Sequence, residues 1–391
     1  MEALFWVSAG IIGYTYFGYP LLLAVWARLA PRAVAKAPIA AVRAALPSVS
    51  IVIAARNEAA RLPGRISNLL ELDYPGRREI IVVSDGSTDG TADAVRACIS
   101  AHRDTERAKA REGVVPDIRV IEVPAGGKPA ALNAAVEAAS GDLLVFADAR
   151  QRFSTDALLH LAANFADDRV GGVTGELRLD CETPEGTASS IGEGVGLYWK
   201  YEKWLRRNES AVWSTLGATG AIYALRRRLW TSLPADTLLD DVLAPMRAVL
   251  GGYRIVFEEH AVAFDRASSD AAAESRRKTR TLAGNYQILW QEPRLLVPLV
   301  NPVWLQYVSH KLARLVVPWA LIGVFAASAV LVTSGWFYTA AFLAQLAFYG
   351  LAAFGGWLDA HHQPVAVEPI ALRPPGAAQS AYEPLGKGAR S

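Results

Sequence analysis

Two long stretches without a charged residue constrain this chain more than any other feature. Residues 3–27 contain no charged side chain, and neither do residues 315–358. A helix needs about 20 apolar residues to cross the roughly 30 Å hydrocarbon core of a bilayer. The first stretch is therefore long enough for one transmembrane helix. The second is long enough for two, joined by a tight turn at Ser334 and Gly335.

These stretches predict three transmembrane helices, over residues 1–30, 315–333 and 336–358. A cleaved signal peptide is the alternative for the first helix. Against it, no basic residue precedes the apolar run, which is also too long for a signal peptide's hydrophobic region. The hydrophobic fraction of 52% and the mean hydropathy of +0.19 agree with a protein that lies partly in a membrane.

Basic residues flank the segment between the first and second predicted spans. They are Arg28, Arg32, Lys36, Arg43, Lys311 and Arg314. The positive-inside rule therefore places this segment in the cytoplasm. We expect an integral protein of the cell (inner) membrane with a large cytoplasmic domain.

Two shorter regions complete the predicted organisation. Residues 298–314 have apolar side chains at helical spacing, which indicates either a helix in contact with membrane lipid at the interface or a core helix. Residues 360–391 are rich in Pro, Ala and Gly without periodicity, and we expect this tail to be disordered.

Charge and cysteine content exclude several classes of protein. The formal net charge of +2 gives no support for a nucleic-acid partner. Cys98 and Cys181 have neither the spacing of metal ligands nor that of a CxxC pair.

Residues 47–295 alternate between apolar runs and helix-forming segments. The runs are SVSIVIAA, EIIVVSD, DIRVIEV and DLLVFADA. Such alternation predicts an α/β domain with a mostly parallel sheet and right-handed crossovers. The GxGxxG and Walker A patterns of two other nucleotide-binding classes are absent from the sequence.

Asp85 and Asp148 each stand at the end of one of these apolar runs. The carboxyl ends of parallel strands form the ligand-binding edge of an open α/β sheet. Two acids at this edge suit a pocket for a nucleotide and a cation.

Five motifs occur in the order and spacing found in one enzyme family. They are SIVIAARNEAARL, VVSDGSTDGT, GKPAALNAA, GDLLVFADAR and TLLDDVLAPMRAVLGGYR. With them the chain resembles the membrane glycosyltransferases of family 2, of the processive polysaccharide-synthase type, from about Ser48 to Tyr307. The resemblance implies a GT-A fold over residues 47–295. It also implies inverting sugar transfer from a UDP-sugar to a growing polysaccharide or lipid-linked glycan.

The resemblance assigns the donor site residue by residue. The turn after the first strand and the acid of the second would hold the uracil, through Ala54, Arg56, Glu58 and Asp85. Asp85 also fits an Asx-type turn, because DGSTDG is dense in turn formers. Lys128 would lie beside the diphosphate at a helix N-terminus, or else remain a solvated lysine.

Asp148 corresponds to the first acid of the family's DxD motif, which binds Mg²⁺ or Mn²⁺. Arg150 stands where the second acid would be. This change removes a cation ligand and adds a positive charge that can contact phosphate directly. We therefore expect a metal at Asp148 and reduced dependence on it.

The acceptor side is assigned in the same way. Asp240 and Asp241 match a Thr-Glu-Asp motif, which makes Asp241 the general base, although an acid before an apolar run is also a helix N-cap signal. Gly217 to Gly220 would allow the acceptor sugar to approach closely.

Arg277, Arg280 and Thr281 fall at the Gln, Arg and Trp of a QxxRW motif, and Arg280 would clamp the diphosphate. The missing Trp weakens the case for processive extension, unless Trp199, Trp204 or Trp213 supplies another platform for the sugar.

Two alternatives remain open from the sequence. One is a transferase that adds a single sugar to polyprenyl phosphate or another lipid, and the other is a catalytically silent scaffold in a synthase complex. Three spans are also few for a self-contained polysaccharide channel, so export would need a partner protein.

Overall fold

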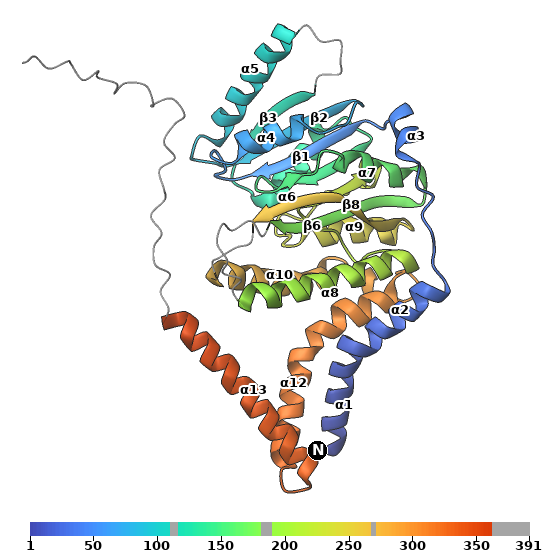
Figure 1. Ribbon diagram of the computed structural model, residues 1–391, viewed down its shortest axis with the longest axis vertical. Helices are drawn as coiled ribbons and strands as arrows, with labels where there is room; N and C mark the ends of the chain where they lie inside the picture. The colour runs from blue at the N-terminus through green and yellow to red at the C-terminus, as the bar shows by residue number, and fades with distance from the viewer. Residues whose placement is uncertain (110–115, 181–189, 267–270, 362–391) are drawn as a thin grey trace, which may run out of the picture. The chain divides into compact units, whose positions relative to one another are not determined.

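The computed structural model describes residues 1–109, 116–180, 190–266 and 271–361. The chain divides into two compact units. One comprises Ala3–Val324, and the other comprises Met1–Glu2 with Phe325 onward. The first unit contains an eight-stranded sheet and its covering helices (Figure 1).

The sheet has the strand order β3-β2-β1-β4-β7-β6-β8-β5. The strands are β1 (Val49–Ala55), β2 (Arg78–Asp85), β3 (Asp117–Val123), β4 (Leu143–Ala147), β5 (Arg152–Phe153), β6 (Val170–Asp180), β7 (Ile222–Arg226) and β8 (Arg254–Arg266). β1 to β4 pair in parallel, as predicted. Beyond β4 the sheet is mixed, because β7 is antiparallel to both neighbours while β6 and β8 pair in parallel.

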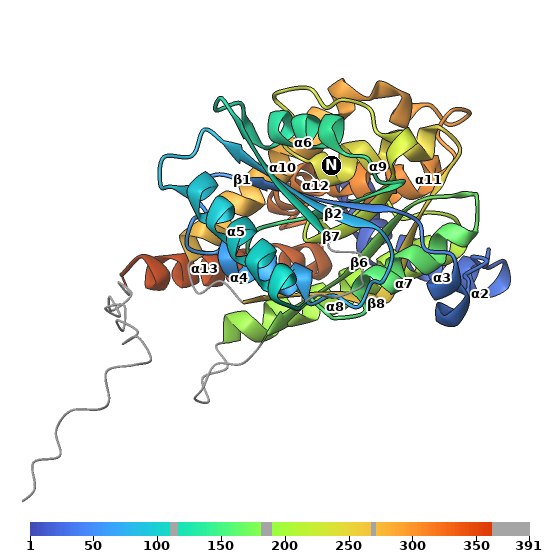
Figure 2. The ribbon, with the colours of Figure 1, turned by 90° about the horizontal axis from the view of Figure 1, so that it is seen from above.

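Helices cover both faces of the sheet, which is why its central strands are continuous apolar runs. α4 (Leu62–Leu70), α5 (Thr91–Lys109) and α7 (Ala157–Ala163) pack on one face, and α6 (Gly127–Ala138) and α9 (Asp240–Leu250) on the other (Figure 2). Successive residues of β1 enter opposite cores: Ile51 and Ile53 face α4, and Val52 faces α6. The two cores hold the carboxyl ends of β1, β2 and β4 in fixed positions.

Three helices are long and apolar enough to cross a membrane: Glu2–Leu29, Trp304–Val330 and Trp336–Leu358. The first consists of α1 (Glu2–Gly13), a π-helical turn (Tyr14–Gly18) and α2 (Tyr19–Leu29). The second consists of α11 (Trp304–Gln306), a π-helical segment (Tyr307–Leu312) and α12 (Ala313–Val330). The third lies within α13 (Trp336–His361).

The sequence predicts that an interface helix ends at residue 314 and that a transmembrane helix begins at residue 315. The structure has no helix boundary at this place. One helix begins at Trp304 and continues to Val330. At 1.5 Å per residue it is about 40 Å long, which exceeds the roughly 30 Å hydrocarbon core. Its first turns can therefore belong to the α/β domain, and Gln306 and His310 are buried there. The predicted tail falls almost entirely on residues 362–391, which lie outside the described residues.

Within the first unit, the two π-helical segments contact each other. The Tyr14 hydroxyl and Ser309 Oγ are 2.7 Å apart, and Tyr19 lies against His310 with ring centroids 6.2 Å apart. Farther along, a side chain at Gly323 would collide with Ser8 Oγ, so glycine permits close packing of the helices there. The N-terminal helix is thereby fixed to the helix that begins at Trp304.

A linker, residues 31–38, joins α2 to the α/β domain. Arg254 holds it in place from the start of β8. The guanidinium is fully buried and donates hydrogen bonds to four backbone carbonyls, those of Arg32 (2.7 Å), Ala33 (3.3 Å), Ser210 (3.1 Å) and Trp213 (2.7 Å). Burial lowers the pKa of Arg254, and the carbonyl dipoles offset part of the cost of its charge.

Candidate active site

A cleft of about 1150 Å³ opens at the carboxyl end of β4. Its wall combines α6, α9, α8 (Ser190–Val212), α10 (Ala271–Gln291) and the helix from Trp304. Nine of the predicted site residues line it: Lys128, Asp148, Arg150, Gly217, Gly220, Asp240, Asp241, Arg277 and Arg280. The fold therefore brings together residues that are more than 150 positions apart in the sequence.

Lys128 lies between two carboxylates at the centre of this cleft. Its Nζ is 3.3 Å from Asp148 Oδ1 and 3.3 Å from Asp240 Oδ2. Burial opposes its charge, but Asp240 and Asp148 raise the pKa of Lys128, so it is a cation at neutral pH. Lys128 was predicted just before a helix and lies instead in the first turn of α6, and its ammonium bridges the predicted metal ligand and α9.

Asp241 lies in the first turn of α9 and faces the glycine-rich segment before β7. A Cβ added to Gly220 would lie 3.0 Å from Asp241 Oδ2, so only glycine leaves this carboxylate uncovered. The Ala218 N–H donates to the Asp241 carbonyl at 2.7 Å, which fixes the segment against the helix. Leu239 occupies the N-cap position, where no side-chain capping bond is made, so neither Asp240 nor Asp241 serves as the cap.

The electrostatics of the site suit Asp241 to accept a proton. Burial, followed by repulsion from Asp240, raises the pKa of Asp241 to about 6, while Lys128 and Lys311 act in the opposite direction. A carboxylate with a raised pKa is a stronger base than an ordinary aspartate and is still mostly ionised at pH 7.

This shift predicts the pH dependence of the reaction. With Asp241 as the predicted base, which accepts a proton only when ionised, kcat/KM should be flat above about pH 7 and fall close to tenfold per unit below about pH 6. Replacing Asp240 with Asn removes the neighbouring charge and should move this acidic limb to lower pH. The profile is measured as release of nucleoside diphosphate from pH 5 to 9. A limb at the same pH in both proteins would contradict the assignment.

Arg150 is paired with an acid that the sequence did not single out. Its Nη2 lies 3.0 Å from Asp265 Oδ2, and the Gln151 amide donates to the same oxygen at 2.9 Å. Asp265 lies near the end of β8 and also lines the cleft. Arg150, at the second DxD position, therefore forms an ion pair with Asp265. A phosphate that contacts Arg150 would have to share it with this acid.

Four residues were predicted to hold the uracil: Ala54, Arg56, Glu58 and Asp85. None of them is among the residues that line the cleft. The Asp85 carboxylate accepts hydrogen bonds from the N–H groups of Gly126 (2.7 Å) and Gly127 (3.0 Å), so it caps the N-terminus of α6. This is a structural role different from the expected turn. Glu58 pairs with Arg61 at 2.6 Å, Ala54 is partly buried, and Arg56 is exposed. Uracil binding by these four residues remains a prediction.

α10 supplies basic residues to the cleft and supports the loop before α9. Arg280 Nη2 donates to the Leu238 carbonyl at 2.9 Å, and Gln287 accepts from the Leu238 N–H at 2.9 Å. Arg277 and Thr281 line the cleft on the same helix. Of the three tryptophans considered as a sugar platform, Trp199 lines the cleft, whereas Trp213 contacts Arg32 and Arg254.

Sequence reasoning missed the cleft wall formed by the helix from Trp304. His310 Nδ1 lies 2.6 Å from Glu209 Oε1, which also accepts from the Tyr19 hydroxyl at 3.0 Å, and Arg314 pairs with Glu202. The neighbouring Lys311 faces the cleft and has no ion-pair partner within the described residues. Lys311 and Arg314 were interpreted from the sequence only as topology signals.

Tyr223 is a second residue that the sequence did not indicate. It is buried in β7 and stacks on Phe146 with ring centroids 4.4 Å apart. Burial and the charges of Asp240, Asp241 and Asp148 raise its pKa far above the usual value. Its hydroxyl is therefore protonated and close to the charges of three acids. It has no hydrogen-bond partner in the described part of the chain.

The mixed sheet, the acidic cleft at its carboxyl edge and the attached apolar helices define a GT-A-type α/β domain on a candidate membrane anchor. Residues 50–230 match the sequence profile described as Glycosyl transferase family 2. This match agrees with the predicted resemblance to family 2, and the predicted GT-A fold class is confirmed.

Similarity to individual proteins extends beyond this domain. A mannosyltransferase from Pyrobaculum calidifontis, solved with GDP-mannose and Mn²⁺, superposes with a TM-score of 0.67 at 25% identity, covering 91% of this chain and 95% of its own.

Two curated relatives match part of their length. The beta-monoglucosyldiacylglycerol synthase of Nostoc sp. (strain PCC 7120 / SAG 25.82 / UTEX 2576) is 27% identical over 72% of this chain, and the poly-beta-1,6-N-acetyl-D-glucosamine synthase of Staphylococcus aureus (strain COL) is 23% identical over 63%. This chain spans 57% of the length of each.

Proposed function

We propose that the protein is an integral membrane glycosyltransferase that transfers a sugar, with inversion, from a nucleoside diphosphate sugar to an acceptor at the cytoplasmic face of the cell membrane. One observation carries this proposal: Asp148, Lys128 and Asp241 share one cleft with the helix from Trp304. Donor chemistry and a membrane-borne acceptor can therefore meet at a single site.

The reaction follows from the charges in the cleft. Asp241 takes the proton of the acceptor hydroxyl as its oxygen attacks the anomeric carbon, and the bond from that carbon to the diphosphate oxygen breaks. Lys128 and Arg280 would stabilise the negative charge on the departing diphosphate. Direct displacement requires no covalent sugar intermediate, which is consistent with a single well-placed base.

The carboxylates present fit a hard divalent cation. Asp148 is 38% exposed and faces the cleft, and Lys128 already marks a place between it and Asp240 where positive charge is stabilised. Asp148 would hold Mg²⁺ or Mn²⁺, which neutralises diphosphate charge. The mannosyltransferase that covers nearly the whole chain was solved with Mn²⁺, which supports a metal here.

The donor is proposed to be a UDP-sugar on the family resemblance, and the same mannosyltransferase binds GDP-mannose. Detergent-solubilised protein is therefore incubated with UDP- and GDP-sugars, with Mn²⁺ or with EDTA, and released nucleoside diphosphate is measured. We expect release from one donor, reduced but not abolished by EDTA because Arg150 supplies part of the positive charge. No release of nucleoside diphosphate from any donor, in the presence of membrane lipid extract, would contradict the proposal.

The unpaired Lys311 favours single addition to an anionic lipid, such as polyprenyl phosphate, over extension of a neutral glycan. Lys311 is half-buried and forms no ion pair within the described residues, so a ligand that supplied negative charge would stabilise its ammonium. Lys311 lies on the helix that continues into the candidate span, lines the same cleft as Asp241 and acts to lower the pKa of Asp241. An export partner protein would be required only if the enzyme instead extends a polysaccharide.

Replacing Lys311 with Met tests this acceptor. We expect KM for a phosphate-bearing lipid acceptor to rise at least about tenfold, the effect of losing one charged hydrogen bond. The assay is run at pH 8, so that Asp241 stays ionised once the nearby cation is gone. Lys200→Met, at an exposed position on α8, is the matched control. An unchanged KM in Lys311→Met would favour a neutral glycan acceptor.

A further inference from the structure

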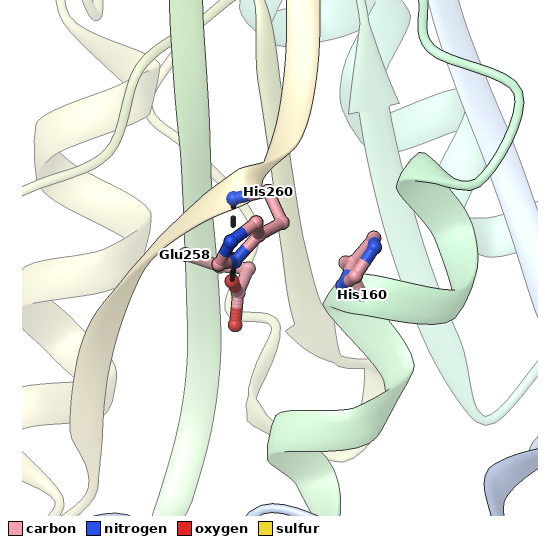
Figure 3. A group of neighbouring side chains, drawn as sticks. All are labelled: His160, Glu258 and His260. Atoms are coloured by element: carbon pink, nitrogen blue, oxygen red, sulfur yellow. Dashed lines mark hydrogen bonds and ion pairs between the residues drawn. The ribbon is translucent and has the colours of Figure 1, made fainter. Parts of the chain in front are cut away.

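A cluster of His160, Glu258 and His260 lies away from the catalytic cleft, and none of the three lines it. His160 projects from α7, while Glu258 and His260 come from β8, and the His160 ring lies beside the Glu258–His260 pair (Figure 3). One potential ligand atom from each residue lies within 4.8 Å of the other two. The proposed sugar transfer makes no use of these residues.

An irregularity in the sheet places the two β8 residues. β6 and β8 pair at Thr174–Phe257 and next at Glu176–Val262, so residues 258–261 of β8 bulge opposite Gly175 alone. A Cβ at Gly175 would approach the Ala261 carbonyl to 2.4 Å, so glycine is required for this bulge. Bulges redirect side chains, and here Glu258 and His260 point to the same side.

The two oxygens of Glu258 have different surroundings. Oε2 accepts from Lys36 Nζ at 2.6 Å and from Asn164 Nδ2 at 2.8 Å. Oε1 lies 3.0 Å from His260 Nδ1. One oxygen is therefore oriented by outer hydrogen bonds while the other faces the imidazoles, which is the arrangement seen around metal-ligating carboxylates.

The two imidazoles are adjacent and one is oriented in the same manner. Their ring centroids are 5.3 Å apart at an angle of 29°. His160 Nε2 lies 3.2 Å from Asp156 Oδ2, one helical turn earlier. Such carboxylate–histidine pairs fix the tautomer of a ligating imidazole. Two imidazoles and a buried carboxylate form a ligand set that suits zinc better than magnesium.

We propose that His160, Glu258 and His260 form a second metal site, for Zn²⁺ or a similar borderline transition-metal ion, that is separate from the donor's Mg²⁺ or Mn²⁺. Tetrahedral zinc with bonds of about 2.0–2.1 Å requires ligand atoms about 3.3 Å apart. Glu258 Oε1 and His260 Nδ1 are 3.0 Å apart, close to this spacing, and His160, which is 24% exposed, has to move by at most about 1.5 Å. Water would complete the coordination.

Bound metal would connect three parts of the chain that meet at this point. It would join α7 to the β8 bulge, and through the Lys36 contact to Glu258 it would also restrain the linker from the N-terminal helix. Its role would therefore be structural. Zn²⁺ should raise the melting temperature of the protein without being needed for sugar transfer.

The test measures metal binding rather than activity. Protein purified without a polyhistidine tag, and with His361 and His362 replaced by Ala, is freed of metal with EDTA. Zn²⁺ is then titrated by calorimetry, and Co²⁺ by its visible absorption. We expect one site with imidazole ligands, and we expect His160→Ala combined with His260→Ala to weaken it by more than about a hundredfold. His102→Ala, which removes an imidazole from α5, should leave it intact.

One further variant and one further measurement make the outcome decisive. Asp148→Asn removes the proposed ligand at the donor site and should leave Zn²⁺ affinity unchanged. Melting curves without metal show whether the double histidine variant is folded, and a Zn²⁺-induced rise in melting temperature should occur only in proteins that keep both imidazoles. Equal Zn²⁺ affinity in wild type and the double variant, or loss of binding only in Asp148→Asn, would overturn the proposal.

Discussion

Asp241→Asn is expected to lower kcat by about 10²–10⁴-fold, the usual contribution of a general base. Asn keeps the size of the side chain and removes its capacity to accept the acceptor's proton. Because the donor is expected to contact Asp148 and Lys128 instead, its dissociation constant should change little. The experiment compares nucleoside diphosphate release with donor binding measured by calorimetry.

Asp168→Asn is the matched control, because that carboxylate is 99% exposed and lies outside the cleft. Its kcat should equal that of the wild type. If Asp241→Asn retained full activity, a different base would be required. If glycan output in cells were also unchanged, the scaffold alternative would gain support over catalysis.

Arg254→Ala is expected to lower the free energy of unfolding by about 3 kcal/mol. The substitution removes a guanidinium that serves four carbonyl oxygens and leaves them without their donor in a buried site. Hydrogen bonds to a charged group contribute about 1.5–3 kcal/mol each, and the cost of burying the charge offsets part of their sum. Denaturant unfolding in detergent, followed by tryptophan fluorescence, measures the change.

Arg254→Lys should fall between Ala and wild type, since one ammonium cannot reach all four oxygens. Arg103→Ala, at an exposed position of α5, provides the control and should change stability by less than about 0.5 kcal/mol. Equal unfolding curves for Arg254→Ala and Arg103→Ala would show that the linker is held by other contacts.

The first half of the sheet was predictable because a local sequence pattern marks each of its strands. β1, β2 and β4 are continuous apolar runs, β1, β2 and β3 are each followed by a helix, and the four strands pair in parallel. β7 is also an apolar run that predicts a strand, but no local pattern indicates its position in the sheet. Its five residues insert between β4 and β6, and this choice depends on the whole assembled sheet.

The catalytic cleft was predictable where motif residues lie at strand or helix ends, as with Asp148, Lys128 and Asp241. Roles that depend on distant partners were not predictable. Asp85 reaches amides 41 and 42 positions away, and Arg150 finds Asp265, 115 positions away. Nor does a sequence pattern mark the π-helical segment Tyr307–Leu312, which contains His310 and Lys311.

The position of Lys128 between Asp148 and Asp240 has a consequence for the resting protein. A tethered ammonium occupies the place where the two acids would otherwise attract free cations from solution. Lys128 thus serves as the counter-ion of the two acids, and a phosphate that attracted Lys128 away would leave both acids able to bind a cation. Metal and nucleotide sugar would then bind as one event, and the idle enzyme would remain insensitive to fluctuations in the divalent cation pool.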